Sequence, residues 1–292
     1  MRRINAARRC DGPLRRGAHV MRLKTAVARV AERAASQFGC RLIPEWRMGN
    51  LQQTEHLAQV FGLLNIDCVL DVGANIGQYH EFLRVFLQYT GAIVSFEPVT
   101  EMYEHLERQR VGDPLWSLHR LALGDTDTTA SINILSERTL SSLLAPNEER
   151  LRQMGYEKYL RETRLERTEE VAVRRLDSIH SEVIPNAASR VFLKSDTQGY
   201  DMAVIRGASG CLDRILGLQI ELPIREVYSG SPAYVDAMAE LKALGYAVTA
   251  FFPVQRDSTL RVINVDCIMI REDETDRLRG LGHHAPGHAQ RP

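Results

Sequence analysis

Apolar segments typical of strands alternate with segments of helical periodicity between residues 66 and 271, and this alternation constrains the fold most strongly. Strands joined by helices imply a parallel sheet covered on both faces, so we expect an α/β, doubly wound architecture. The last two predicted strands, 246–252 and 265–271, have no helix between them, which makes the final strand antiparallel. The other predicted strands are 68–72, 92–96, 116–123, 130–135, 191–196 and 217–222, and the first helices are 77–88 and 100–110.

Charge divides the chain into an arm and a domain. The whole sequence has 37 basic and 37 acidic side chains, but residues 1–40 hold ten bases against two acids, a net +8, which leaves −8 for the remainder. An acidic remainder argues against a protein that binds nucleic acid through bulk positive charge. We expect a basic, partly disordered arm at 1–48, a folded domain at 49–272 and a disordered tail at 273–292.

Residues 22–38 form an amphipathic pattern within the basic arm. A basic amphipathic helix is typical of peripheral contact with a membrane surface or of a targeting segment. A helix packed on the edge of the domain is the alternative, and Met21 is a second candidate start of translation. We expect no transmembrane segment, because no apolar run reaches roughly 18 residues.

Two further regions add limited information. Residues 137–170 are rich in Glu and Arg, and we interpret them as an inserted helical segment that caps a pocket, with a solvated helix pair as the alternative. The five cysteines form no CxxC pair, so neither a structural zinc site nor a dithiol redox site is predicted.

A glycine-rich turn, Asp71-Val72-Gly73-Ala74-Asn75-Ile76-Gly77, follows the first strand and opens a helix. We expect Gly73 to permit a tight turn where a Cβ would collide with a ligand, and Gly77 to permit close packing of the helix. Twenty residues later Glu97 ends the second strand, where a carboxylate can accept hydrogen bonds from both ribose hydroxyls. The turn and Glu97 together predict a nucleoside-containing cofactor.

Two classes of cofactor fit this layout. A dinucleotide site requires a G-x-G-x-x-G pattern, which this turn lacks. The carboxylate of Asp71 would repel a diphosphate but could pair with an ammonium group. S-adenosylmethionine has a ribose, an ammonium group and no phosphate, so it is favoured over NAD or FAD, and a purely structural turn is the remaining alternative.

A second polar cluster follows the strand at 191–196. Alternation along a strand places Lys194 and Asp196 on the same side, in the crevice where doubly wound proteins bind ligands. Asp196 could accept the proton of a substrate hydroxyl, and Lys194 could keep that carboxylate ionised and orient it. A buried ion pair without a catalytic role is the alternative. Glu221, at the end of the next strand, is a third candidate facing the same crevice.

Five segments stand out together: VLDVGANIGQY, SFEP, LALGD, the turn at 175–178 and FLKSDTQGYDMAVIRGA. With them the chain resembles the FkbM-type methyltransferases over about residues 66–272. The resemblance implies a class I methyltransferase (Rossmann-like) fold with a seven-stranded sheet and S-adenosylmethionine as cofactor. It implies that the Lys194–Asp196 cluster lies at the methyl-transfer site. The residues implied to bind the cofactor are Asp71, Gly73, Asn75 and Gly77 at its methionyl end, Glu97 at its ribose, and Leu123 and Asp125 near its adenine.

The sequence departs from the usual text of that family at two positions. The family text is closer to lysine, isoleucine, aspartate, with a glutamate after the tyrosine, whereas this chain has Ser195 and Asp201. We expect Ser195 to face away from Lys194, which would leave the site little changed.

The sequence therefore predicts a cytoplasmic methyltransferase that methylates a hydroxyl of a sugar, a glycan or a secondary metabolite. Because the sulfonium carbon is already electrophilic, the enzyme would supply mainly proximity and alignment. The scheme requires no metal, although the Asp196–Glu221 pair leaves a divalent cation open. The partner is a small-molecule or glycan acceptor and no nucleic acid is expected. The alternatives are an RNA or other N- or C-methyltransferase, a non-catalytic scaffold and an NAD-dependent oxidoreductase.

Overall fold

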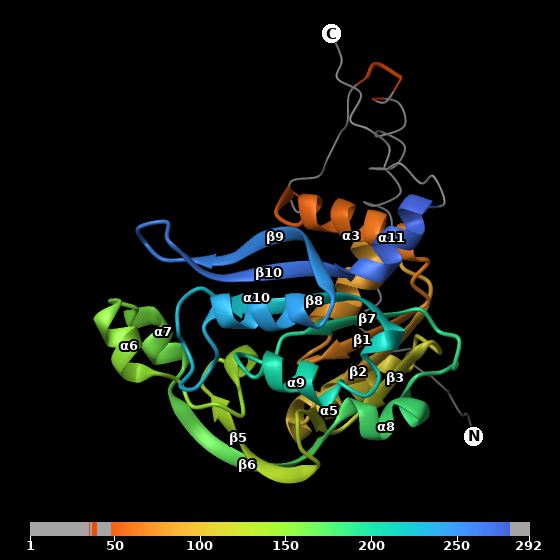
Figure 1. Cartoon of the computed structure of the whole chain (residues 1–292). Helices are drawn as coiled ribbons and strands as arrows, with labels where there is room; N and C mark the ends of the chain where they lie inside the picture. Colours follow the sequence, from red (N-terminus) through yellow and green to blue (C-terminus); the bar gives the residue numbers. More distant parts are fainter. Residues whose placement is uncertain (1–34, 36, 40–47, 281–292) are drawn as a thin grey trace, which may run out of the picture. The chain divides into compact units, whose positions relative to one another are not determined.

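The structure, a computed structural model, describes residues 35, 37–39 and 48–280 (Figure 1). The chain divides into two compact units, Met1–Thr54 and Glu55–Pro292. Helix α3 (Leu51–Leu64) crosses this boundary, and the site described below lies in the second unit. Most of the basic arm at 1–48, including most of the amphipathic segment 22–38, lies outside the described residues.

A seven-stranded sheet forms the centre of the second unit, with the strand order β3-β2-β1-β7-β8-β10-β9. Strand β10 is antiparallel to both of its neighbours, and the other adjacent pairs are parallel. The expected doubly wound, mostly parallel sheet with an antiparallel last strand is therefore confirmed. The strands are β1 (Cys68–Val72), β2 (Ala92–Phe96), β3 (Trp116–His119), β7 (Val191–Ser195), β8 (Ile215–Pro223), β9 (Tyr246–Arg256) and β10 (Val262–Arg271).

Helices cover both faces of this sheet (Figure 1). In β1, Leu70 and Val72 pack into one apolar cluster with three helices of one face, whereas Val69 packs into a second cluster on the other face. This alternation follows from the two-residue period of a strand. One face carries α3, α4 (Gln78–Glu81), a π-helical turn (Phe82–Phe86) and α5 (Thr100–Arg110), and the other carries α8 (Leu176–Val183), α9 (Asp201–Gly207) and α10 (Tyr234–Ala243).

A second, three-stranded sheet has the order β4-β6-β5, with bounds Ala122–Leu123, Leu165–Arg174 and Thr128–Leu135. Its presence corrects two expectations. The predicted strand 116–123 is interrupted after His119, so that β3 stays in the central sheet while β4 pairs with β6.

The second correction concerns the predicted helical insertion at 137–170. This segment contains a short 3-10 turn (Arg138–Leu140) and the helices α6 (Glu148–Gln153) and α7 (Glu157–Glu162), but residues 165–170 belong to β6. Strand β5 supplies an antiparallel partner along this part of the chain. The charged side chains of β6 find partners too, since Glu169 accepts hydrogen bonds from the backbone N–H and the hydroxyl of Thr100.

The expectation of disorder from residue 273 onward is also wrong for 273–280. These residues belong to α11 (Glu272–Gly280), whose Glu274 forms an ion pair of 3.0 Å with Arg190. Acidic side chains in its first turn complement the helix dipole. Residues 281–292 lie outside the described part of the chain.

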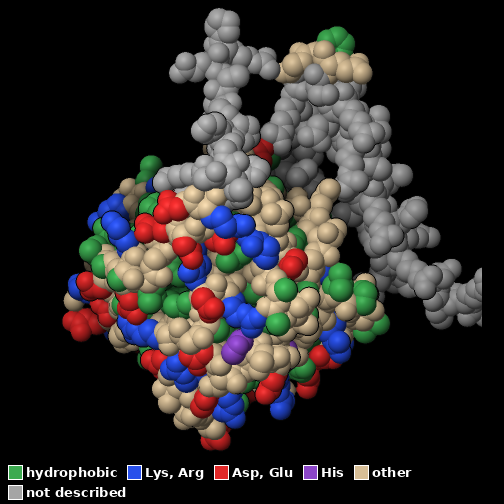
Figure 2. Space-filling view, turned by 45° about the vertical axis from the view of Figure 1, so that its right-hand side comes forward, with side chains coloured by type: hydrophobic (Ala, Val, Ile, Leu, Met, Phe, Trp, Pro, Cys, Tyr) green, Lys and Arg blue, Asp and Glu red, His purple; other side chains and the backbone are tan. Residues whose placement is uncertain are grey.

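Acidic and basic side chains are interspersed over the face seen in Figure 2.

Helix α9 follows the polar loop 196–200, and its last residue, Gly207, packs against the backbone of Gly124. A Cβ at position 207 would collide with the carbonyl oxygen of Gly124.

We predict that Gly207→Ala lowers the free energy of unfolding by about 2 kcal/mol or more, because overpacking outweighs the gain in helix propensity. Gly62→Ala is the matched control, since a Cβ added at this helical position in α3 would meet no other atom within 4 Å. The control should raise the free energy of unfolding by up to about 1 kcal/mol. Denaturant unfolding measures both, and a neutral or stabilising Gly207→Ala would contradict the packing.

Candidate active site

A buried ion pair joins β1 and β7 where both strands approach their carboxyl ends. Asp71 and Lys194 are direct neighbours in the sheet register, and Lys194 Nζ lies 3.2 Å from Asp71 Oδ1. The Asp71 side chain is fully buried, and its other oxygen accepts a hydrogen bond of 3.1 Å from the Ser95 hydroxyl. Burial disfavours the ammonium form of Lys194, but the adjacent carboxylates outweigh it and raise the pKa of Lys194 above its ordinary value.

The same ammonium group reaches two other parts of the site. Lys194 Nζ lies 3.8 Å from Asp196 Oδ2 and donates a hydrogen bond of 3.4 Å to the carbonyl oxygen of Gly73. Lys194 and Asp196 thus lie on one side of the chain, as alternation predicts. Unlike Asp71, the side chain of Asp196 is 41% exposed. It is therefore a carboxylate that a ligand can reach, held in place by a buried cation.

The glycine-rich turn is held by backbone packing. Gly73 has a φ of 78°, and a Cβ there would collide with the carbonyl oxygen of Asp196. We expected a ligand to exclude a Cβ at this position. The structure shows that the backbone of Asp196 excludes it. Gly77, with a φ of 90°, lies at the start of α4, where a Cβ would meet Gln109 Oε1 at 2.9 Å. Close packing at the helix start is confirmed.

Glu97 closes the turn from the second strand. Its two oxygens accept hydrogen bonds from the backbone N–H groups of Asn75, at 2.7 Å, and of Val99, at 2.9 Å. Burial raises the pKa of Glu97 to about 7, although these two hydrogen bonds act in the opposite direction. Asn75 has a φ of 49°, and its side-chain oxygen is buried without a hydrogen-bond partner among the described residues.

Gln198 connects Asp196 to Glu221, and sequence reasoning missed it. Its amide nitrogen lies 2.7 Å from Asp196 Oδ1 and 3.3 Å from Glu221 Oε2. Its amide oxygen lies 3.1 Å from the hydroxyl of Tyr228. The position of Gln198 in a polar run after a buried strand was a usable signal, whereas Tyr228 lies in an irregular segment that carries none.

Glu221 differs chemically from Asp196. It is buried and accepts a hydrogen bond of 3.1 Å from the amide of Asn264. Burial, reinforced by the nearby carboxylates of Asp196 and Asp201, raises the pKa of Glu221 well above its ordinary value. Burial and these carboxylates thus disfavour a charge on Glu221, whereas Asp196 is partly exposed.

The two positions at which the sequence departs from the family text form a pair. The Ser195 hydroxyl donates a hydrogen bond of 2.6 Å to Asp201 Oδ1, and both groups are buried. The same carboxylate accepts from the backbone N–H groups of Thr197 and Gly199. Asp201 thus fixes the loop that carries Asp196 and Gln198, on the side of β7 away from Lys194.

Leu123 and Asp125 lie in different surroundings from the other predicted residues. Leu123 is a core residue and is 1% exposed, so its side chain packs with the sheet. Asp125 is partly exposed, and its carbonyl oxygen accepts a hydrogen bond of 2.8 Å from Arg175. Their placement near an adenine stays a prediction. In this prediction the backbone and Asp125 would contact the adenine, and the buried side chain of Leu123 would not.

Within residues that the structure describes, no group of three or more His, Cys, Asp or Glu side chains is placed to hold a metal ion. None of the described helices combines the length and the apolar character that crossing a bilayer requires.

The model of the methyltransferase FkbM domain family matches residues 71–248, more than half of the chain. The chain belongs to this family. The match begins at Asp71 and includes the glycine-rich turn, Glu97 and the loop that carries Asp196. The resemblance to FkbM-type methyltransferases is confirmed, and methyl transfer is the class of activity that membership supports. No curated protein shows significant sequence similarity to the chain.

The solved structures to which this chain is similar include methyltransferases. Methyltransferase FkbM from Methylobacillus flagellatus KT has a TM-score of 0.44 and 14% identity, over 70% of this chain and 44% of the other. This chain thus spans less than half the length of that protein. An rRNA methylase from Streptococcus thermophilus has a TM-score of 0.42 and 10% identity, over 79% and 98% of the two chains. Magnesium protoporphyrin IX methyltransferase from Synechocystis PCC 6803, solved with S-adenosylmethionine, has a TM-score of 0.42 and 10% identity, over 85% and 96%.

The ion pair between Asp71 and Lys194 removes the electrostatic reason for preferring S-adenosylmethionine to NAD. The ammonium group expected beside Asp71 is supplied by Lys194, so the charge that would repel a diphosphate is already balanced. Electrostatic repulsion therefore does not by itself exclude NAD, and the preference for S-adenosylmethionine rests on the family.

We predict that Glu97 makes the cofactor-free protein less stable as the pH rises from about 5 to about 8, because its folded-state pKa of about 7 exceeds the ordinary value of 4.5. The stabilisation is fully present below the unfolded pKa and is lost as the pH rises through the folded pKa. Glu97→Gln should reduce this loss by about 3 kcal/mol. Denaturant unfolding at each pH measures it. The exposed Glu101→Gln should retain the wild-type profile, and an unchanged profile in Glu97→Gln would contradict the assignment.

Proposed function

We propose that this protein uses S-adenosylmethionine to methylate a hydroxyl oxygen on a sugar, a glycan or a secondary metabolite. Family membership supports methyl transfer. The observation that carries the choice of a hydroxyl is Asp196, a partly exposed carboxylate beside a buried ammonium group and the buried Glu221. Such a carboxylate can take a proton from a hydroxyl in direct contact with it.

The residues around the glycine-rich turn fit the cofactor. The buried Asn75 Oδ1 lacks a hydrogen-bond partner among the described residues, and a buried acceptor of this kind is costly unless a ligand donor satisfies it. Glu97 holds two backbone N–H groups and retains lone pairs for ribose hydroxyls. When bound, S-adenosylmethionine supplies a methyl group on a positively charged sulfur. Gly73, Asn75, Gly77 and Glu97 would hold it, with Asp71 as a positioning residue that acts through Lys194.

The two acidic residues of the acceptor side take different roles in this proposal. Asp196 accepts the proton as the acceptor oxygen is methylated. Lys194 and Gln198 hold its two carboxylate oxygens in a fixed orientation, at 3.8 Å and 2.7 Å. Because Glu221 is buried and Asp196 is partly exposed, Glu221 positions Gln198 in this proposal while Asp196 meets the acceptor. Leu123, the last residue of β4, and Asp125, two residues further on, would border the adenine.

Isothermal titration tests the cofactor assignment. S-adenosylhomocysteine should bind the wild-type protein, and NAD should not. Glu97→Ala should weaken this binding by about tenfold or more, because charge-assisted hydrogen bonds to the ribose are lost. The matched control is Glu101→Ala, an exposed acid of α5, which should leave the affinity unchanged. Binding of NAD without binding of S-adenosylhomocysteine would overturn the proposal in favour of an oxidoreductase.

A deletion strain tests the role of Asp196 and identifies the acceptor class. Metabolites and surface glycans from the strain should include a molecule lighter by one methylene unit. Complementation with Asp236→Asn, an exposed acid of α10, should restore the heavier molecule. Complementation with Asp196→Asn should not, since loss of a general base slows a reaction by about a hundredfold or more. Full restoration by Asp196→Asn, with the protein present at the same level, would reduce Asp196 to a structural residue.

A further inference from the structure

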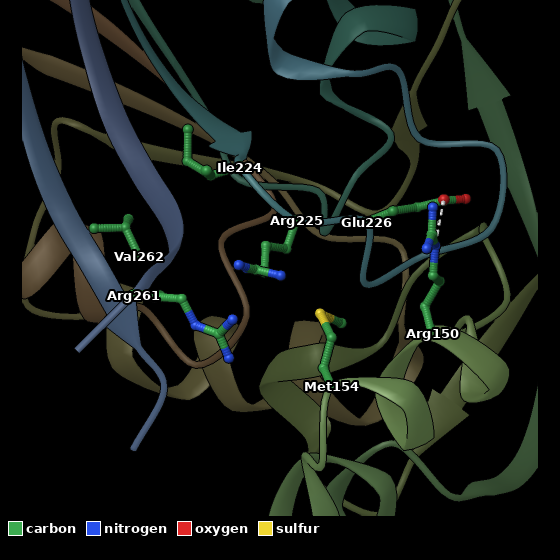
Figure 3. Close-up of a pocket in the computed structure, with 7 residues that line it drawn as sticks. All are labelled: Arg150, Met154, Ile224, Arg225, Glu226, Arg261 and Val262. Carbon is green, nitrogen blue, oxygen red and sulfur yellow. Dashed lines mark ion pairs between the residues drawn. The ribbon is translucent and has the colours of Figure 1, made fainter. Parts of the chain in front are cut away.

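A cavity of about 460 Å³ lies directly beyond the carboxyl end of β8 (Figure 3). Three elements form its walls: the segment after β8, the start of β10 and helix α6. Parallel sheets bind ligands beyond the carboxyl ends of their strands, so this cavity lies at the edge that carries the site. Its lining residues are Arg150, Met154, Ile224, Arg225, Glu226, Arg261 and Val262.

The lining contains three guanidinium groups and one carboxylate. Arg150 lies 3.8 Å from Glu226, and Arg261 forms an ion pair of 2.9 Å with Asp257. Arg225 takes part in no ion pair within the described residues, although it is partly buried. Figure 3 shows the guanidinium groups of Arg225 and Arg261 in the same open space between β10 and α6. Because Asp257 already neutralises Arg261, Arg225 is the guanidinium of this space that has no carboxylate partner within the described residues.

Two walls of the cavity are continuous along the chain with segments that hold Glu221. The backbone N–H groups of Ile224 and Arg225 donate to the carbonyl oxygen of Ile263, at 2.8 Å and 3.2 Å. The next residue, Asn264, donates its amide to Glu221, which lies two residues before the end of β8. The segments that hold Arg225 thus continue directly into those that hold Glu221 and, through Gln198, Asp196.

We propose that this arginine cavity binds an oxyanion, a carboxylate or a phosphate, carried by the methyl acceptor. The planar fork of arginine matches carboxylate and phosphate oxygens in pairs, and Arg225 offers such a fork beside the paired Arg150 and Arg261. The identity of the occupant as the acceptor rests on the proposed function, whereas binding of the anion does not. The acceptor is then a hydroxyl compound of the sugar-phosphate or sugar-acid class, and a neutral sugar would bind poorly.

Titrations of the full chain with glucose 6-phosphate, glucuronate and glucose at one ionic strength test this proposal, with and without S-adenosylhomocysteine. The two anionic sugars should bind at least about tenfold more tightly than glucose. Arg225→Gln should weaken binding of the anions by about tenfold, and Glu226→Gln should tighten it, because it releases Arg150 from its partner. The exposed Arg108→Gln in α5 should change neither.

The opposite signs of the two variants separate a charge effect from misfolding, because a damaged protein would not bind more tightly. Equal binding of glucose and the anionic sugars, no binding of either anion, or anion binding unchanged in Arg225→Gln would each overturn the proposal. The S-adenosylhomocysteine titration is read separately. Anion binding without cofactor binding would support the anion site and contradict the proposed function. Binding of S-adenosylhomocysteine without binding of either anion would support the proposed function and contradict the anion site.

Discussion

The buried ion pair between Asp71 and Lys194 is the interaction on which the rest of the site depends. Removing two charges from water is costly, and the pair is stable here because every part of it has a further partner. Ser95 donates to Asp71, while Lys194 reaches the carbonyl of Gly73 and the carboxylate of Asp196. One ammonium group therefore connects the glycine-rich turn after β1 with the acid after β7, which are the two halves of the proposed site.

The loop after β7 extends this arrangement toward the acceptor side. Asp201 holds the loop by accepting hydrogen bonds from the Ser195 hydroxyl and from two backbone N–H groups of the loop. Gln198 connects Asp196 to Glu221. Glu221 is buried and Asp196 is partly exposed, so Asp196 is the acid of this pair that a ligand can reach. Beyond Glu221, the ends of β8 and β10 carry the arginine cavity. The proposed cofactor site, the carboxylate of Asp196 and the arginine cavity thus follow one another along neighbouring strands of the sheet.

Sequence patterns predicted those parts of the molecule that are set by local periodicity. Strands such as 68–72 are mostly apolar, and the two-residue period correctly placed Lys194 beside Asp196. The partnership of Lys194 with Asp71 depends on β1 and β7 being neighbours, which only the folded sheet determines. Strand β6 was missed because its charged residues resemble a solvated helix until β5 and α5 provide partners. The arginine cavity unites residues from three distant segments, so no local pattern could indicate it.

A double-mutant cycle on Asp71 and Lys194 tests most directly whether this ion pair supports the site. The free energy of unfolding is measured for Asp71→Asn, Lys194→Met and the double variant. Each single variant leaves a buried charge or polar group without its partner, and Lys194→Met should cost about 3–5 kcal/mol. The double variant should be clearly less destabilised than the sum of the two single variants, with a coupling of about 1–3 kcal/mol. Additive effects of the two substitutions would show that the pair does not hold β1 and β7 together and would contradict the account.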